Sequence, residues 1–123
     1  MKKVTGIGGI FFKCADPKKM NEWYSQNLGL PVASWGTMFK SRDIDDPEKL
    51  VTTVWSPFPE TTKYFEPSQR EFMINYRVEN IEALVEELKN AGVTFVDELT
   101  GSEYGKFVHI LDPEGNKIEL WEA

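Results

Sequence analysis

The sequence has one cysteine and one histidine in 123 residues, and these shortages exclude several kinds of site. A single cysteine, Cys14, excludes an internal disulfide and every zinc motif built from several cysteines, and it is typical of a reducing compartment. No stretch approaches the roughly 18 consecutive apolar residues of a membrane-spanning helix, and the first residues contain no long apolar run. We therefore expect a cytoplasmic protein without membrane contact.

Basic residues are also scarce. Fourteen Lys and Arg stand against 20 Asp and Glu, which gives a net charge of −6. Capture of DNA or RNA requires clustered positive charge, so we expect no nucleic-acid partner. The acidic run at residues 43–48 is interpreted as a solvated loop.

Aromatic residues are plentiful, at 13% of the chain. A chain of this length can form one domain with a hydrophobic core and no disulfide, so we expect a single domain spanning residues 1–123. The aromatic side chains must then line its core, a pocket or a contact surface.

The end of the chain has the pattern of a β-hairpin. Two runs of β-forming residues, 107–111 and 117–121, flank a cluster of Asp, Pro, Gly and Asn. Centring the loop on Glu114 places the only histidine, His109, opposite Glu119. The other face of this hairpin is wholly apolar, which supports the register: Val108, Ile110, Ile118 and Leu120.

The order strand, helix, three strands occurs twice along the chain. In the first half we expect strands at residues 7–14, 32–35, 37–40 and 50–55, with a helix capped by Asp16 and ended by Gly29. In the second half we expect strands at residues 72–78, 93–97 and in the closing hairpin, with a helix capped by Asn80 and ended by Gly92. The first helix has an apolar stripe that we interpret as core, including Trp23 and Tyr24. We therefore divide the chain into module 1 (about 4–56), a linker rich in proline (about 57–70) and module 2 (about 71–123).

These motifs resemble the vicinal oxygen chelate superfamily, which groups glyoxalase I, extradiol dioxygenases, and bleomycin and fosfomycin resistance proteins. The resemblance rests on residues 8–12, 16–30, 78–93 and, most specifically, the closing segment 112–120. It implies an α+β fold in which two βαβββ modules form a curved mixed sheet, a trough, with the helices on its outer face. The linker either joins the two halves of one trough or passes the second half to a partner chain.

The superfamily holds a divalent metal with two residues from each half, and this chain departs from that pattern. The family's metal positions fall on Gly9, Thr53, Met73 and Glu119. Glycine has no side chain, and a thioether is poorly suited to hard or borderline metals. Only Glu119 is a suitable ligand, so we expect a member depleted in metal ligands, with no metal and no other cofactor.

The residues expected to point into the trough form an aromatic floor with a few polar groups, which is typical of a small-molecule pocket. They are Phe11, Lys13, Thr53, Trp55, Met73, Asn75, Arg77, Phe107, His109, Glu119 and Trp121. Arg77 and Lys13 are candidates to receive an anionic group of a ligand, or to form salt bridges with Glu119. Trp35 and Trp55 are assigned to either the pocket wall or a subunit contact.

Three functions fit this pattern. The first is binding of a small organic molecule in a metal-free trough, as in the drug-binding resistance proteins of the superfamily. The second is an enzyme of lyase, isomerase or dioxygenase type whose catalytic candidates are His109 and Glu119, although a structural cross-strand hydrogen bond explains the pair without any chemistry. The third is an interaction module whose trough is closed by its own side chains. Exposed aromatic residues and the proline-rich linker also suggest a homodimer.

Overall fold

The computed structural model describes residues 3–123, so residues 1 and 2 of the expected domain lie outside the described residues. Two helices and seven strands follow one another along the chain. They are β1 (Val4–Cys14), α1 (Pro17–Leu28), β2 (Thr37–Arg42), β3 (Leu50–Pro59), β4 (Phe72–Val78), α2 (Ile81–Asn90), β5 (Thr100–Ser102), β6 (Gly105–Leu111) and β7 (Lys117–Glu122). Neither helix of the described chain is long and apolar enough to cross a membrane.

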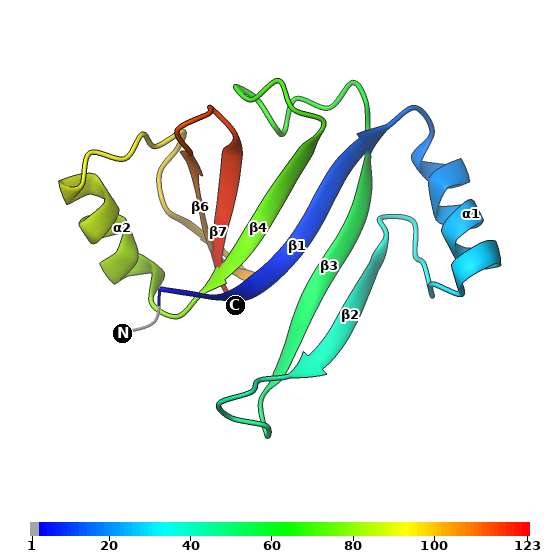
Figure 1. The fold of residues 1–123 in the computed structure, drawn as a ribbon, viewed down its shortest axis with the longest axis horizontal. Helices are drawn as coiled ribbons and strands as arrows, with labels where there is room; N and C mark the ends of the chain where they lie inside the picture. The colour runs from blue at the N-terminus through cyan, green and yellow to red at the C-terminus, as the bar shows by residue number, and fades with distance from the viewer. Residues whose placement is uncertain (1–2) are drawn as a thin grey trace.

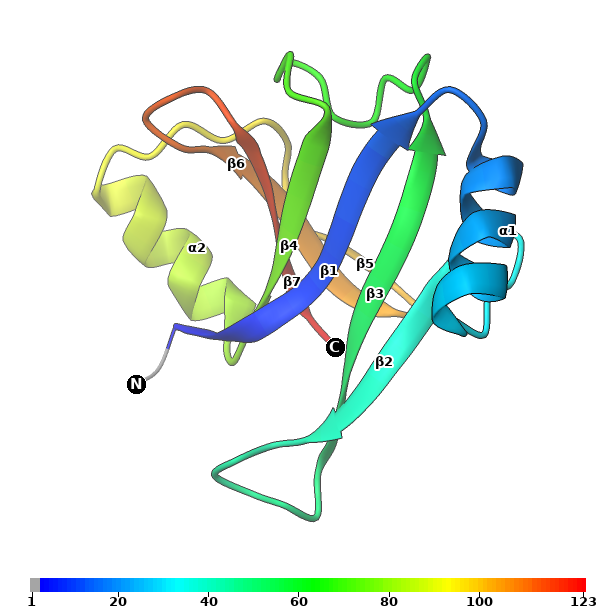
Figure 2. The ribbon, with the colours of Figure 1, turned by 45° about the vertical axis from the view of Figure 1, so that its right-hand side comes forward.

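All seven strands belong to one curved mixed sheet, in the order β2-β3-β1-β4-β7-β6-β5 (Figure 1). β1 pairs with β3 and β4 with β7 in parallel, whereas β1 and β4 pair antiparallel. The last pairing joins the two modules within one chain. The helices lie at opposite flanks of the sheet (Figures 1 and 2). The predicted α+β fold with helices on the outer face of a curved sheet is therefore confirmed.

Both helices begin where their caps predict. The Asp16 side chain accepts a hydrogen bond from the backbone N–H of Lys19, and the Asn80 side chain accepts one from Ala83. Gly29 ends α1 with a φ of 70°, a left-handed conformation that glycine adopts without steric cost.

The prediction that Trp23 is a core residue is wrong, because its side chain is 54% exposed. Helix α1 packs only against the margin of the sheet, where Tyr24 contacts Trp55 of β3 with ring centroids 4.7 Å apart. The outer half of its apolar stripe therefore remains in solvent.

Two of the predicted strands are not formed, and each is replaced by a single β-bridge. Residues 32–35 form only the bridge between Ala33 and Gly36, and residues 93–97 only the bridge between Phe95 and Ile110. In the second case the Asp97 carboxylate accepts the backbone N–H of His109 at 2.8 Å, so the side chain replaces the next backbone bond of the ladder. β5 forms further along the chain, at Thr100–Ser102.

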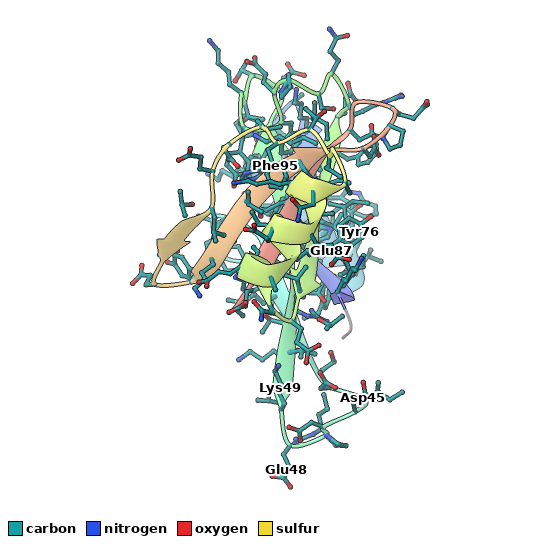
Figure 3. The ribbon with its side chains drawn as sticks, turned by 90° about the vertical axis from the view of Figure 1, so that its left-hand side faces the viewer. Asp45, Glu48, Lys49, Tyr76, Glu87 and Phe95 are labelled. Atoms are coloured by element: carbon teal, nitrogen blue, oxygen red, sulfur yellow. The ribbon has the colours of Figure 1, made fainter. Side chains whose placement is uncertain are left out.

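Strand β3 continues to Pro59, into the segment expected to be a linker. Its pairing with β2 stops at Trp55, so the prolines at 57 and 59 lack a neighbour on that side and cost no ladder hydrogen bond there. At the opposite end, the loop that joins β2 to β3 extends away from the sheet, with Asp45, Glu48 and Lys49 at its tip (Figure 3).

Buried apolar residues form two clusters. The larger one lies between α2 and strands β4, β6 and β7, and contains Val78, Ile81, Leu84, Val85, Val108, Ile110 and Leu120. The smaller one lies on the other face of the sheet and contains Phe11, Phe65 and Met73. Phe65 comes from the segment between β3 and β4, so this segment folds back onto the trough.

Candidate functional site

The closing hairpin has the predicted register. His109 pairs with Glu119, Phe107 with Trp121, and Leu111 with Lys117. The side chains of His109 and Glu119 face each other across the two strands, with 2.7 Å between His109 Nε2 and Glu119 Oε2. The histidine and the carboxylate therefore lie on the trough face, opposite the larger core cluster.

Glu119 is the centre of a buried polar network. Its side chain is almost fully buried, and Oε2 accepts hydrogen bonds from His109 Nε2 and from the Tyr64 hydroxyl. Its other oxygen, Oε1, accepts from Asn75 Nδ2 at 2.6 Å. Three donors thus surround one carboxylate, which compensates the cost of burying its charge.

Both ring nitrogens of His109 face carboxylates, because Nδ1 lies 2.7 Å from Asp97 Oδ2. A neutral imidazole has only one N–H, so both contacts are satisfied together only by the imidazolium. Burial alone would lower the pKa of His109, but the hydrogen bonds to Glu119 and Asp97 outweigh it and raise that pKa. The geometry therefore favours the imidazolium form, which makes an ion pair with Glu119.

Burial alone would also raise the pKa of Glu119, but the hydrogen bonds from His109, Tyr64 and Asn75 lower it. Burial, followed by the nearby Glu119 carboxylate, raises the pKa of Tyr64. The tyrosine consequently remains a neutral hydrogen-bond donor to an ionised carboxylate.

Tyr64 and Phe65, which we call the strap, cover one end of the trough. The segment that contains them loops over the sheet between the ends of β3 and β4 (Figures 1 and 2). Phe65 is fully buried with Met73, and the Tyr64 ring lies edge-on to His109 at 5.5 Å. Lys117 Nζ donates to the backbone oxygen of Tyr64 at 2.6 Å, which fixes the strap to β7.

The rest of the trough encloses a cavity of about 580 Å³, which we call the trough cavity. Both modules contribute to its wall, which is mostly aromatic and aliphatic: Gly8, Phe11, Trp35, Met38, Thr52, Val54, Asn75, Tyr104, Phe107, Glu119 and Trp121. The rings of Phe107 and Trp121 are stacked, with centroids 5.9 Å apart and 3° between their planes. This arrangement suits a flat organic molecule.

A family model described as a glyoxalase-like domain matches residues 9–121. The chain belongs to the glyoxalase-like family. This places it in the vicinal oxygen chelate superfamily, as its motifs predicted.

Solved structures share the fold of this glyoxalase-like chain at low identity. A variant of methylmalonyl-CoA epimerase from Streptomyces coelicolor, in complex with 2-nitronate-propionyl-CoA, is 18% identical with a TM-score of 0.70, and the match covers 98% of each chain. A Mn(II)-bound glyoxalase from Novosphingobium aromaticivorans is 16% identical with a TM-score of 0.64, covering 99% of this chain and 40% of the other. A superfamily member from Vibrio splendidus 12B01 is 14% identical with a TM-score of 0.60, covering 95% and 97%. No curated protein matches the chain.

Five of the residues expected in the trough line the cavity of this glyoxalase-like domain: Phe11, Asn75, Phe107, Glu119 and Trp121. His109 lies on the same face beneath the strap. Five wall residues were not expected there, namely Gly8, Met38, Thr52, Val54 and Tyr104. Trp35, which the sequence left open between pocket and subunit contact, lies in the cavity wall. No sequence signal marked Tyr104, whose backbone oxygen accepts Trp121 Nε1 at 2.8 Å.

The expectation that Thr53 and Trp55 face the trough is wrong. Trp55 packs against Tyr24 of α1 on the outer face, and Thr53 Oγ1 donates to the backbone oxygen of Ile7. Thr52 and Val54, the alternate residues of β3, line the cavity instead. Gly9 of β1 pairs with Val54 of β3, whereas Asn75 of β4 pairs with Glu119 of β7.

The expected anion partners are engaged elsewhere. Arg77 Nη1 donates to the backbone oxygens of Ile7 and Thr52, at 2.8 and 2.6 Å. Lys13 Nζ lies 5.6 Å from the centre of the Phe65 ring. Neither forms the alternative salt bridge to Glu119, and Met73 is fully buried core.

The residues at the family's metal positions do not fit a divalent metal. Gly9 offers no donor, Thr53 donates its hydroxyl to the backbone oxygen of Ile7, and Met73 is buried with Phe65. Glu119 itself already accepts from Tyr64, His109 and Asn75. Residues 3–123 contain no group of three or more His, Cys, Asp or Glu placed to hold a metal ion.

Proposed function

We propose that this glyoxalase-like chain binds a small organic molecule in the trough cavity and does so without a metal. The observation that carries the proposal is the cavity itself, about 580 Å³ with aromatic walls from both modules. Its volume lies within the range of about 300–1,000 Å³ typical of small-molecule sites. Its few polar groups, Asn75 and Glu119, lie together at the floor, where they orient a ligand.

The state of His109 and Glu119 supports binding over acid–base catalysis. Both ring nitrogens of His109 are paired with carboxylates, and both oxygens of Glu119 accept hydrogen bonds. A general base needs a free lone pair that faces the substrate; both nitrogens of His109 are engaged, and Glu119 already accepts three hydrogen bonds. An enzyme that uses His109 as its general base therefore requires this network to open first.

The strap agrees in part with the alternative of an interaction module, in which the trough is closed by its own side chains. Phe65 and Tyr64 fill one end of the trough. The remaining cavity is nevertheless of ligand size, which favours the binding proposal over an interaction module.

A thermal-shift screen of aromatic and heteroaromatic compounds tests the proposal, with two tryptophan variants as probes. Trp35 lines the cavity and is 45% exposed, so Trp35→Ala removes a wall at little cost to the core. Trp23→Ala removes an exposed tryptophan outside the cavity and is the matched control.

Compounds are expected to raise the Tm of the wild type and of Trp23→Ala by several degrees, and to lose most of that effect in Trp35→Ala. A diverse library without a single stabilising compound contradicts the proposal. So do compounds that stabilise all three proteins equally, because their site then lies outside the trough.

We also propose that the chain forms a homodimer through the outer face of its sheet. Ile10 of β1 and Phe72 of β4 lie on neighbouring strands, and each is 44% exposed. The exposed Trp23 of α1 adds a third large apolar side chain. Large exposed apolar side chains of this kind support a contact between copies.

A further inference from the structure

The wall of the trough cavity has no positive charge. No lysine, arginine or histidine is among the described residues that line it, and its one acidic residue is Glu119. That carboxylate is ionised at neutral pH because hydrogen bonds from His109, Tyr64 and Asn75 favour the charged form. A bound anion would therefore lose its hydration without gaining a cationic partner.

The cationic groups close to the trough already have partners, and His109 is paired with Asp97 and Glu119. Arg77 Nη1 donates hydrogen bonds to the backbone oxygens of Ile7 and Thr52. Lys117 donates to the strap and lies over the Tyr64 ring, with its ammonium 5.1 Å from the ring centre. Lys13 Nζ lies 5.6 Å from the centre of the Phe65 ring. None of these cationic groups lines the trough cavity, so an anionic ligand there has no cationic partner in direct contact.

The aromatic walls favour the opposite charge. Aromatic rings present negative faces, so a cation enclosed by several rings is attracted to them. Five wall residues are aromatic, and they come from both modules: Phe11, Trp35, Tyr104, Phe107 and Trp121. The net charge of −6 on the chain adds a weaker, longer-range attraction for cations.

The floor of the cavity also contains an unused acceptor. Asn75 donates its Nδ2 to Glu119, and the reversed amide would place two oxygens against each other, so Oδ1 must point the other way. No donor among the described residues reaches Oδ1, although Asn75 is only 2% exposed. It lies beside Gly8, where a Cβ atom would come within 2.2 Å of it. A buried acceptor of this kind is stabilised by a ligand that donates an N–H.

We propose that the trough cavity selects neutral or positively charged aromatic molecules that carry an N–H donor, and that it rejects anions of the same shape. The inference rests on the proposed function and adds the chemical class of the ligand. The aromatic body lies among the five rings, and the donor group points toward Asn75 and Glu119.

Three probes with one ring system test the selectivity: 1-naphthylmethylamine, 1-naphthalenemethanol and 1-naphthoate, measured by calorimetry and saturation-transfer NMR at neutral pH. The amine is expected to bind tightest and the carboxylate weakest, with about a tenfold or larger difference in Kd between them. A carboxylate that binds as tightly as the amine overturns the inference while the binding function stands. If none of the three binds, the inference fails, and the library screen decides separately whether the binding function fails with it.

A matched pair of variants on β2 tests whether the charge of the wall causes the selectivity. Met38 lines the cavity and is 46% exposed, whereas the next residue, Phe39, is 48% exposed and does not line it. Met38→Lys is expected to weaken the amine about tenfold and to strengthen the carboxylate, whereas Phe39→Lys changes both by less than about twofold. Equal effects of the two variants overturn the inference, because they assign the selectivity to net charge instead of the wall.

Discussion

Each ring nitrogen of His109 lies 2.7 Å from a carboxylate oxygen, Nδ1 from Asp97 and Nε2 from Glu119. The sequence predicted the second contact, because the register of the closing hairpin follows from one apolar face and one loop. It did not predict the first, since Asp97 lies on a segment whose pairing with β6 is only a bridge. Both acidic neighbours raise the pKa of His109, so the second carboxylate adds to the effect of the first.

We predict that His109 titrates above the ordinary pKa of histidine, about 6.5. As the only histidine of the chain, it gives one unambiguous set of imidazole signals in a proton NMR titration. Glu119→Gln, which removes one anionic partner, is expected to lower that pKa, whereas the exposed Glu114→Gln leaves it unchanged. Titration of the wild-type residue below the ordinary value would contradict the ion-pair assignment.

Stability should depend on pH in a direction that follows from the same network. A raised pKa of His109 stabilises the fold fully below about pH 6.5, and this contribution disappears as pH rises through the folded-state pKa. The lowered pKa of Glu119 stabilises the fold above about pH 4.5, and this contribution disappears as pH falls through its folded-state pKa. Urea midpoints are therefore expected to be higher at about pH 6 than at about pH 9, and the difference should shrink in Glu119→Gln.

Tyr64→Phe removes the strap hydroxyl that donates to Glu119. The loss of a hydrogen bond to a buried carboxylate should cost about 1–3 kcal/mol in the free energy of unfolding, measured by urea denaturation. Tyr104→Phe removes an exposed hydroxyl and serves as the control, with an expected change below about 0.5 kcal/mol. Equal losses in the two variants would show that the Tyr64 hydroxyl does not support the network.

At the scale of elements, the capping residues correctly predicted where the helices begin, whereas the alternation of side chains did not predict the inner face of every strand. Asp16 and Asn80 begin the two helices as expected, because their side chains satisfy free N–H groups. The phase of β3 was missed because both of its faces have similar side chains: Thr52 and Val54 on one, Thr53 and Trp55 on the other. Alternation contains no information in such a strand, and only its neighbours in the sheet decide which face is inside.

The strap could not be predicted for a different reason. Its segment has no periodicity, and its position depends on contacts with distant residues such as Met73 and Lys117. Sequence patterns report local structure, whereas the position of this segment over the trough depends on long-range contacts.

The turn before β2 depends on Gly36, which has a φ of 131°. A Cβ at this position would lie 2.1 Å from the backbone oxygen of Trp55. Gly36→Ala is therefore expected to destabilise the protein by at least about 2 kcal/mol, read as a lower urea midpoint. Gly101→Ala is the control, because a Cβ at Gly101 meets open space. An unchanged midpoint for Gly36→Ala would mean that the turn can rearrange freely.

At the scale of the whole molecule, the apolar side chains exposed on the outer face of the sheet lead us to expect self-association. We predict a homodimer by sedimentation analysis at micromolar concentration, and Phe72→Lys is expected to shift it toward monomer. Ile44→Lys adds the same charge in the exposed loop between β2 and β3 and should leave the dimer intact. A wild-type monomer at all concentrations contradicts the prediction. The cytoplasmic location expected from the sequence stays a prediction.

The strap also makes the two ends of the trough different. Tyr64 and Phe65 pack across the trough near the end where β3 and β4 are joined, and neither residue lines the trough cavity. A ligand bound in the cavity as proposed would meet the strap at that end, so any excess length would extend away from the strap into solvent. In a homologous series of ligands, affinity should therefore rise with chain length only until the trough cavity is filled and then level off. The length of the cavity would then set the longest ligand that still gains affinity.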